Sequence, residues 1–168
     1  MAWSKYLIVS FLAFLLVSCS ISYKMDGASI NYALTQTIHI SDFIDRTSAY
    51  SPMASMFNQA LRKRFIEQTR LRDVKANADI EMEGEITGFE STELAVKQDT
   101  YASQTRLTIT IRIEYINNKE AGKDISQSFS AYQEFPSTQS INDVQDELVK
   151  KIIDDLVDMI YNATVASW

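Results

Sequence analysis

Three stretches of the chain alternate apolar and polar residues, and this alternation limits the possible folds more than any other feature. The stretches cover residues 80–88, 106–115 and 128–135. Successive side chains of a strand point to opposite faces, so each stretch places apolar residues on one side and Glu, Arg, Ser and Thr residues on the other. This pattern is typical of an antiparallel sheet that is covered on one side only. A short turn over residues 117–122 indicates that the last two stretches form a hairpin.

The polar side of the first stretch carries three glutamates at alternate positions, Glu81, Glu83 and Glu85. Alternate residues on one face of a strand lie roughly 7 Å apart, and catalytic carboxylates need unlike environments that separate their pKa values. Nothing in the sequence separates these three. We therefore expect a solvated face whose glutamates pair with Arg106 or Arg112 on the neighbouring strand, in preference to an active site or a metal site.

Two amphipathic helices are predicted outside these strands. Apolar residues recur at helical spacing over residues 53–65 and 141–163, which gives each helix one apolar stripe. Ser51 with Pro52 marks the start of the first helix, and Ser140 is expected to cap the second. The first helix is basic on its polar side and the second is acidic, so we expect the two to lie side by side.

Both helices are expected to cover the apolar side of the sheet, because each predicted strand has only one such side. Gly84 and Gly88 are expected on this covered side, where a missing side chain lets a helix approach closely. A further short strand is predicted over residues 37–40, with the single histidine, His39, facing solvent. These elements together predict an α+β domain with both helices on one face of the sheet.

An apolar run over residues 7–17 leads into Ser18-Cys19, which contains the only cysteine among the 168 residues. The run has the length of a secretory h-region and is too short to span a bilayer comfortably. A small residue followed by cysteine is what lipoprotein signal peptidase requires. We therefore expect residues 1–18 to be a lipoprotein signal peptide and Cys19 to carry lipid. The alternatives are an ordinary signal peptide with a stray cysteine, or a buried cysteine in a cytosolic protein.

The rest of the chain is expected to form a lipidated tether over residues 19–36 and a single domain over residues 37–168. With one cysteine no intramolecular disulfide can form, so stability must come from a packed core. The chain has 16 basic and 22 acidic residues and a formal net charge of −6, which argues against general binding to nucleic acid. No Walker loop, dinucleotide fingerprint, Ser/His/Asp set or metal-ligand cluster occurs in the sequence. We therefore expect no enzymatic activity, no cofactor and no metal.

Several short motifs follow one another along the chain. They are Asp26-Gly27-Ala28-Ser29-Ile30 after the cysteine, Gln68-Thr69-Arg70-Leu71, Glu83-Gly84-Glu85-Ile86-Thr87-Gly88, Arg106-Leu107-Thr108-Ile109-Thr110-Ile111 and Ser128-Phe129-Ser130-Ala131-Tyr132, with an acidic helix near the C-terminus. In this order and spacing the chain resembles the LptE-like lipopolysaccharide-assembly lipoproteins of the outer membrane. The resemblance implies two helices packed on one face of a mixed, mainly antiparallel four-stranded sheet.

The resemblance also implies a lipid anchor on the periplasmic side of the outer membrane and a stoichiometric partner. This partner is LptD, the outer-membrane barrel that delivers lipopolysaccharide to the cell surface; the lipoprotein plugs the barrel, helps it assemble and contacts lipopolysaccharide. The expected partner-facing residues are those on the polar side of the sheet: Thr108, Thr110, Arg112, Ser128 and Ser130.

Two cations near an expected exposed loop over residues 91–105 are candidates for lipopolysaccharide contact by position alone. They are Lys97 and Arg106, and ordinary surface charge is the alternative explanation for both. For the whole protein, the alternative function is that of a periplasmic auxiliary lipoprotein of an ABC-type lipid transporter.

Overall fold

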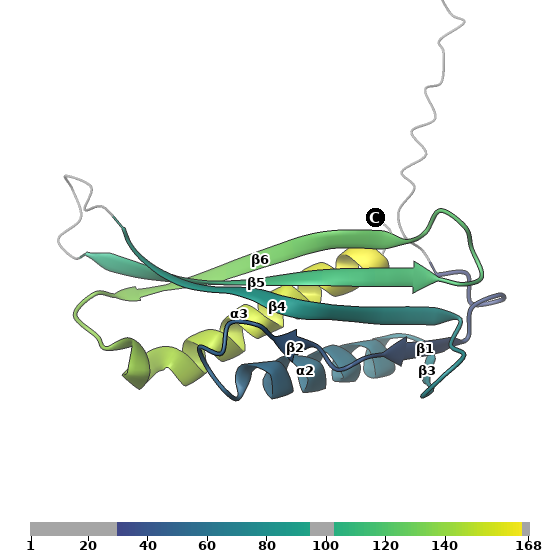
Figure 1. Cartoon of the computed structure of the whole chain (residues 1–168), viewed down its shortest axis with the longest axis horizontal. Helices are drawn as coiled ribbons and strands as arrows, with labels where there is room; N and C mark the ends of the chain where they lie inside the picture. Colours follow the sequence, from purple (N-terminus) through teal and green to yellow (C-terminus); the bar gives the residue numbers. More distant parts are fainter. Residues whose placement is uncertain (1–29, 95–102, 166–168) are drawn as a thin grey trace, which may run out of the picture.

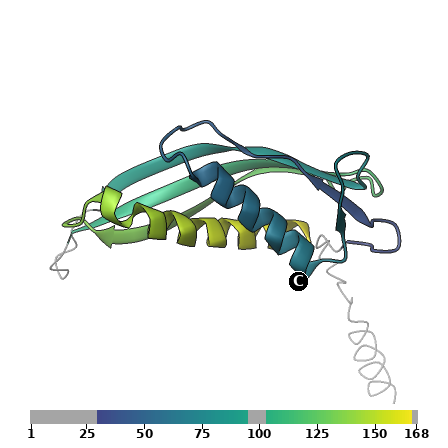
Figure 2. The ribbon, with the colours of Figure 1, turned by 90° about the horizontal axis from the view of Figure 1, so that it is seen from below.

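Two helices lie along one face of a long, curved sheet in the computed structural model, which describes residues 30–94 and 103–165 (Figure 1). The view from below shows α2 and α3 on the same side of the sheet and inclined to each other (Figure 2). In chain order the elements are β1 Thr37–Ile40, β2 Ile44–Asp45, α2 Met53–Gln68, β3 Arg72–Asp73, β4 Ile80–Leu94, β5 Gln104–Asn117, β6 Ile125–Pro136 and α3 Ile141–Thr164.

The sheet is mixed and mainly antiparallel, as predicted. Its strand order is β3-β1-β4-β5-β6, with β2 pairing separately with β4. Of the three long strands, β5 pairs antiparallel with both β4 and β6. The short strand β1 pairs in parallel with β3 and β4, and β2 pairs in parallel with β4. The described sheet therefore has six strands, and the predicted count of four was wrong. The two extra strands, β2 and β3, are two residues long, which is too short to show an alternation.

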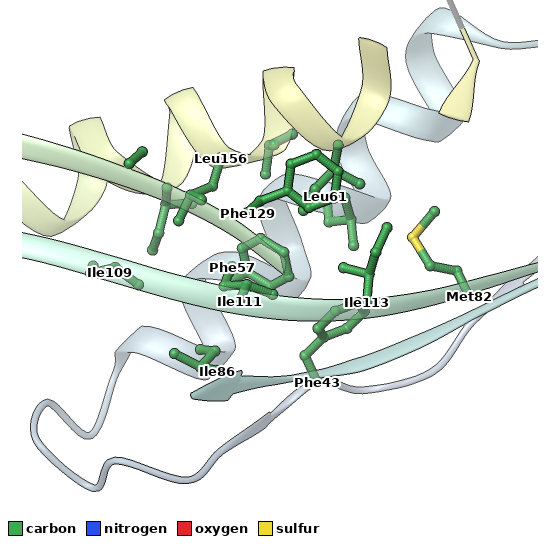
Figure 3. Close-up of a cluster of buried hydrophobic side chains, with 14 of the residues drawn as sticks. Phe43, Phe57, Leu61, Met82, Ile86, Ile109, Ile111, Ile113, Phe129 and Leu156 are labelled. Carbon is green, nitrogen blue, oxygen red and sulfur yellow. The ribbon is translucent and has the colours of Figure 1, made fainter. Parts of the chain in front are cut away.

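The core fills the space between the helices and the apolar side of the sheet (Figure 3). Phe57 and Leu61 from α2 and Leu156 from α3 are fully buried against the isoleucines of β5. Full burial of side chains of this size contributes roughly 1.5–3 kcal/mol each. The apolar positions of β5 are buried along the strand, at Leu107, Ile109, Ile111, Ile113 and Tyr115. The predicted helix-covered face is thus confirmed.

A bulge in β4 changes the direction of its second half. The register with β5 shifts between Ile86 and Gly88, so that Gly88 lies opposite Thr110 on the polar side of the sheet. The expectation that Gly88 lies on the covered side was therefore wrong, because an extra residue in one strand moves every later side chain to the other face. Gly84 does lie on the covered side, where a Cβ would collide with the Arg112 carbonyl and the ring of Phe43, neither of which belongs to a helix.

The ends of the elements also differ from the predictions. The residue preceding α2 in the cap position is Pro52 and not Ser51, and neither Pro52 nor Ser140 makes a side-chain capping hydrogen bond. Part of the expected loop over residues 91–105 is strand, because β4 continues to Leu94 and β5 begins at Gln104; residues 95–102 lie outside the described part of the chain. Residues 91–93 are exposed on both sides, so this ribbon carries no apolar period that a sequence pattern would detect. Ile30 and Thr35, within the expected tether, are buried.

The two helices lie side by side, in agreement with their opposite charges. A guanidinium nitrogen of Arg64 lies 2.9 Å from a carboxylate oxygen of Asp158, and the same guanidinium lies over the ring of Tyr161. The Tyr161 hydroxyl donates to the Gln68 carbonyl at 3.0 Å.

His39, expected to face solvent, is half-buried, and its Nδ1 lies 2.9 Å from the carbonyl oxygen of Val74.

Candidate partner-binding face of the sheet

The side of β4, β5 and β6 turned away from both helices carries polar residues along its length, and we call it the open face. Neither helix covers it in either view of the ribbon (Figures 1 and 2). Strand alternation places the polar residues of β5 and β6 on this side. The open face is defined by Arg106, Thr108, Thr110 and Arg112 of β5 and by Ser128, Ser130, Tyr132 and Glu134 of β6.

The antiparallel register brings all five predicted partner-facing residues onto neighbouring rungs of the β5–β6 ladder. Thr110 lies opposite Ser130, and Arg112 lies opposite Ser128. Thr108 occupies the next rung, where its cross-strand neighbour is Tyr132. The hydroxyls of Thr110 and Ser130 are 2.8 Å apart and share one hydrogen bond. Because each hydroxyl has one donor and two acceptor sites, this pair retains capacity for a hydrogen bond with a partner.

Arg106 is held in place by two neighbours on β6. Its Nη2 and Nε donate to Oε1 of Glu134 at 2.7 and 3.2 Å, and its guanidinium carbon lies 4.0 Å from the centre of the Tyr132 ring. The side chain remains 37% exposed. Tyr132 and Glu134 belong to the predicted alternating stretch. Alternation alone does not identify them as partners of Arg106, because that pairing depends on the register of the hairpin.

The expected pairing of the β4 glutamates with Arg106 or Arg112 was wrong in the described residues. Glu85 instead forms an ion pair with Arg46, at 2.9 Å between Nε and Oε2. Arg112 lies opposite Glu85 in the register but makes no ion pair within 4 Å with any described residue. Arg46 directly follows β2, which pairs with β4. The sequence pattern did not predict this two-residue strand.

A shallow hollow of about 360 Å³ lies at the β4 end of the open face. Its lining contains Arg112 together with four acidic residues, which are Asp42, Glu83, Glu85 and Glu114. This mixture of one cation with several carboxylates is strongly hydrated when free, and it offers both ion pairs and hydrogen-bond acceptors to a polar surface. The hollow therefore suits contact with polar groups of a partner more than it suits an apolar ligand.

Two of the predicted functional residues lie outside the described part of the chain. These are the expected lipidation site, Cys19, and the candidate lipopolysaccharide contact Lys97. Within residues 30–94 and 103–165, no group of three or more His, Cys, Asp or Glu side chains is arranged to hold a metal ion. Over the same residues, neither helix is long and apolar enough to cross a membrane.

Solved structures with a similar fold include several bacterial lipoproteins. The rare lipoprotein B from Shewanella oneidensis is 12% identical, with a TM-score of 0.52 over 74% of this chain and 90% of that chain. An uncharacterized lipoprotein B from Nitrosomonas europaea is 13% identical, with a TM-score of 0.50 over 76% and 81% of the two chains. A protein from Xanthomonas campestris is 10% identical, with a TM-score of 0.54 over 84% and 87%. At these identities the likeness shows the fold alone.

Sequence comparison gives the family. No curated protein matches the chain. The family model of LptE, described as lipopolysaccharide-assembly, matches residues 35–164, a span that contains both described helices and all six described strands. The chain therefore belongs to the LptE family of non-catalytic lipoproteins, which implies a role in lipopolysaccharide assembly.

Proposed function

We propose that this protein is an outer-membrane lipoprotein that partners and plugs an LptD-like barrel during lipopolysaccharide assembly. Cys19 carries the lipid anchor, and the folded domain lies on the periplasmic side of the membrane. Membership of the LptE family supports the choice of partner. The observation that carries the orientation is the open face, on which hydroxyls and charged groups lie along two long strands without a covering layer.

The chemistry of the open face fits the inner wall of a barrel. Such a wall is polar, because in transmembrane barrels the apolar residues point outward to lipid. Thr108, Thr110 and Ser130 offer hydroxyls, while Arg112 and the glutamates of β4 offer charges. A face of this kind is soluble alone and still forms many hydrogen bonds and ion pairs when it meets a polar partner.

Photo-crosslinking in living cells tests this orientation. A photoreactive residue is placed singly at Thr108, Thr110 or Ser130, with Asp154 on the exposed side of α3 as the control position. We expect crosslinks to the barrel from the three open-face positions and none from the control. If the protein co-purifies with the barrel but none of the three positions crosslinks, the orientation is refuted. If it does not co-purify, the alternative of an ABC-transporter auxiliary lipoprotein replaces the proposal.

We also propose that Arg106 and Lys97 contact phosphate groups of lipopolysaccharide. Glu134 accepts from two of the five N–H donors of Arg106, so the fixed guanidinium keeps further donors for a phosphate. Binding of purified lipopolysaccharide to Arg106→Ala and Lys97→Ala proteins tests this role. The control is Lys150→Ala, which removes a cation that is exposed on α3. Equal binding by all three variants and the unaltered protein would exclude both residues.

The lipid anchor has its own test. Intact-mass measurement of the protein purified from membranes is expected to show a chain beginning at Cys19 with attached acyl groups. A Cys19→Ser protein is expected to lose both the processing and the lipid mass. An unmodified N-terminus at another residue would remove the anchor from the proposal.

A further inference from the structure

The two terminal strands of the order β3-β1-β4-β5-β6 are protected against further pairing to very different degrees. One edge is β3, which has only two residues, Arg72 and Asp73, both charged. The other edge is β6, which has twelve residues and a single charged side chain, Glu134. Short strands and charges are the usual means by which proteins block pairing at a sheet edge. In the described chain β3 has both of these features, whereas β6 is long and has Glu134 as its one charge.

The outer edge of β6 is also free of partners among the described residues. Only β5 pairs with β6, and its register runs from Gln104↔Pro136 to Tyr115↔Ile125 without a bulge. About half of the backbone N–H and C=O groups of an edge strand point away from its neighbour. Over residues 125–135 these outward groups make no hydrogen bond to another described element. A regular row of donors and acceptors is therefore available to an added strand.

A groove of about 740 Å³ runs between this edge and α3. Its walls are residues 130–134 of β6 and four residues of α3, which are Asp155, Asp158, Met159 and Asn162. Five residues of strand span roughly 17 Å, so the groove accommodates a short extended segment beside β6. Tyr132 is 51% exposed and Met159 is 40% exposed, which provides apolar surface on either side of such a segment.

The charges of the groove distinguish between possible occupants. Asp158 is paired with Arg64, and Glu134 is paired with Arg106. Asp155 accepts only an amide hydrogen bond from Gln133, at 3.1 Å, and makes no ion pair with a described residue. A second copy of this chain would bring the same carboxylate to the same groove. Charge complementarity therefore favours a different protein whose segment carries a Lys or Arg side chain.

We infer that an extended segment of the proposed barrel partner adds to the outer edge of β6 as a further strand. Its backbone pairs with residues 130–134, an apolar side chain packs on Met159, and a basic side chain reaches Asp155. Main-chain hydrogen bonds supply affinity in this mode of recognition, and the alternating side chains supply specificity. The inference rests on the proposed function, and it assigns the partner a second point of attachment besides the open face.

A pair of adjacent charge reversals on α3 tests the inference in the full-length lipidated protein. Asp155→Lys places a cation in the groove, whereas Asp154→Lys makes the same charge change at the neighbouring position, away from β6. We expect Asp155→Lys to reduce the amount of co-purified barrel at least fivefold and Asp154→Lys to leave it unchanged. Both variants should keep the melting temperature of the unaltered protein, since both positions are exposed.

Hydrogen exchange on the purified complex provides a readout specific for strand pairing. Alternate amides of residues 130–134 should exchange at least tenfold more slowly in the complex than in the free protein. Equal barrel recovery with both lysine variants and no alternating protection would overturn the inference, even if Thr108 and Thr110 on β5 crosslink to the barrel. Failure of the unaltered protein to recover the barrel would instead refute the proposed function, and this inference with it.

Discussion

The buried amide of Asn58 allows a sharp test of how the segment after β1 is held against α2. Its Oδ1 accepts the backbone N–H of Phe43 at 2.9 Å, and its Nδ2 donates to the backbone carbonyl of Phe43 at 3.2 Å. Asn58 is only 9% exposed. One side chain thus satisfies both backbone polar groups of a buried residue, and the ring of Phe43 packs on Phe57 with centroids 5.0 Å apart.

The Asn58→Ala substitution leaves these two backbone groups without partners. Each unsatisfied buried group costs about 1–3 kcal/mol, and partial entry of water into the vacated space reduces the sum, so we expect a loss of about 2–4 kcal/mol. For a domain of this size 1 kcal/mol corresponds to roughly 4 °C in melting temperature. The expected decrease in melting temperature is therefore about 8–16 °C.

Thermal unfolding followed by circular dichroism measures this change, with Gln59→Ala as the matched control. Gln59 is exposed on the same turn of α2, and its side-chain amide donates a hydrogen bond to the Ser55 hydroxyl at 3.2 Å, so its loss should leave the melting temperature nearly unchanged. If Asn58→Ala lowers the melting temperature no more than Gln59→Ala does, the hydrogen bonds to Phe43 do not stabilise the fold as argued.

Three further substitutions have expected outcomes. Leu156→Asp places an unpaired carboxylate at a fully buried position and should cost about 3–5 kcal/mol; an unchanged melting temperature would contradict the helix-covered core. Gly84→Ala should destabilise more than Gly88→Ala in urea titrations, because its Cβ meets the Phe43 ring and the Arg112 carbonyl, whereas at Gly88 the nearest atom is in the Thr110 side chain at 3.1 Å. Asp79 has a pKa lowered to about 2, chiefly because the N–H of Gln36 donates to its carboxylate. This stabilisation is present above about pH 4 and is lost as the pH falls toward 2, so Asp79→Asn should show a smaller fall in urea midpoint between pH 6 and pH 2 than the unaltered protein.

The parts of the fold that were predicted correctly are long elements with a periodic sequence pattern, in which the same side is buried along the whole length. The apolar positions of β5 lie beneath the helices, so burial and alternation agree from Leu107 to Tyr115. The stripe of α3 was predicted for the same reason, although Met159 on its border is exposed. A long element with one buried side can therefore be predicted from its hydrophobic periodicity.

The remaining features depend on contacts between distant residues. The bulge before Gly88 reverses the side to which each later residue of β4 points, relative to strict alternation. No local sequence pattern predicts this bulge. The two-residue strands β2 and β3 exist only because neighbours pair with them. At the candidate site, alternation placed five residues on one polar face, but the pairing of Arg106 with Glu134 follows from the hairpin register. Such features require the tertiary structure, because their cause lies elsewhere in the chain.

The interior position of β1 has a mechanical consequence. The chain enters the sheet at Thr37 and lies at once between β3 and β4, paired in parallel with both. A pull on residues before Thr37, directed along this strand, therefore loads the hydrogen bonds of both ladders together in shear and does not open them one at a time from an edge. Asp79 adds two more attachments at the same point, since its carboxylate accepts the N–H groups of Gln36 and Thr37. Force that reaches the domain from its N-terminal side is thus resisted where the sheet is covered on both flanks, and the rate of forced unfolding depends on these few rungs.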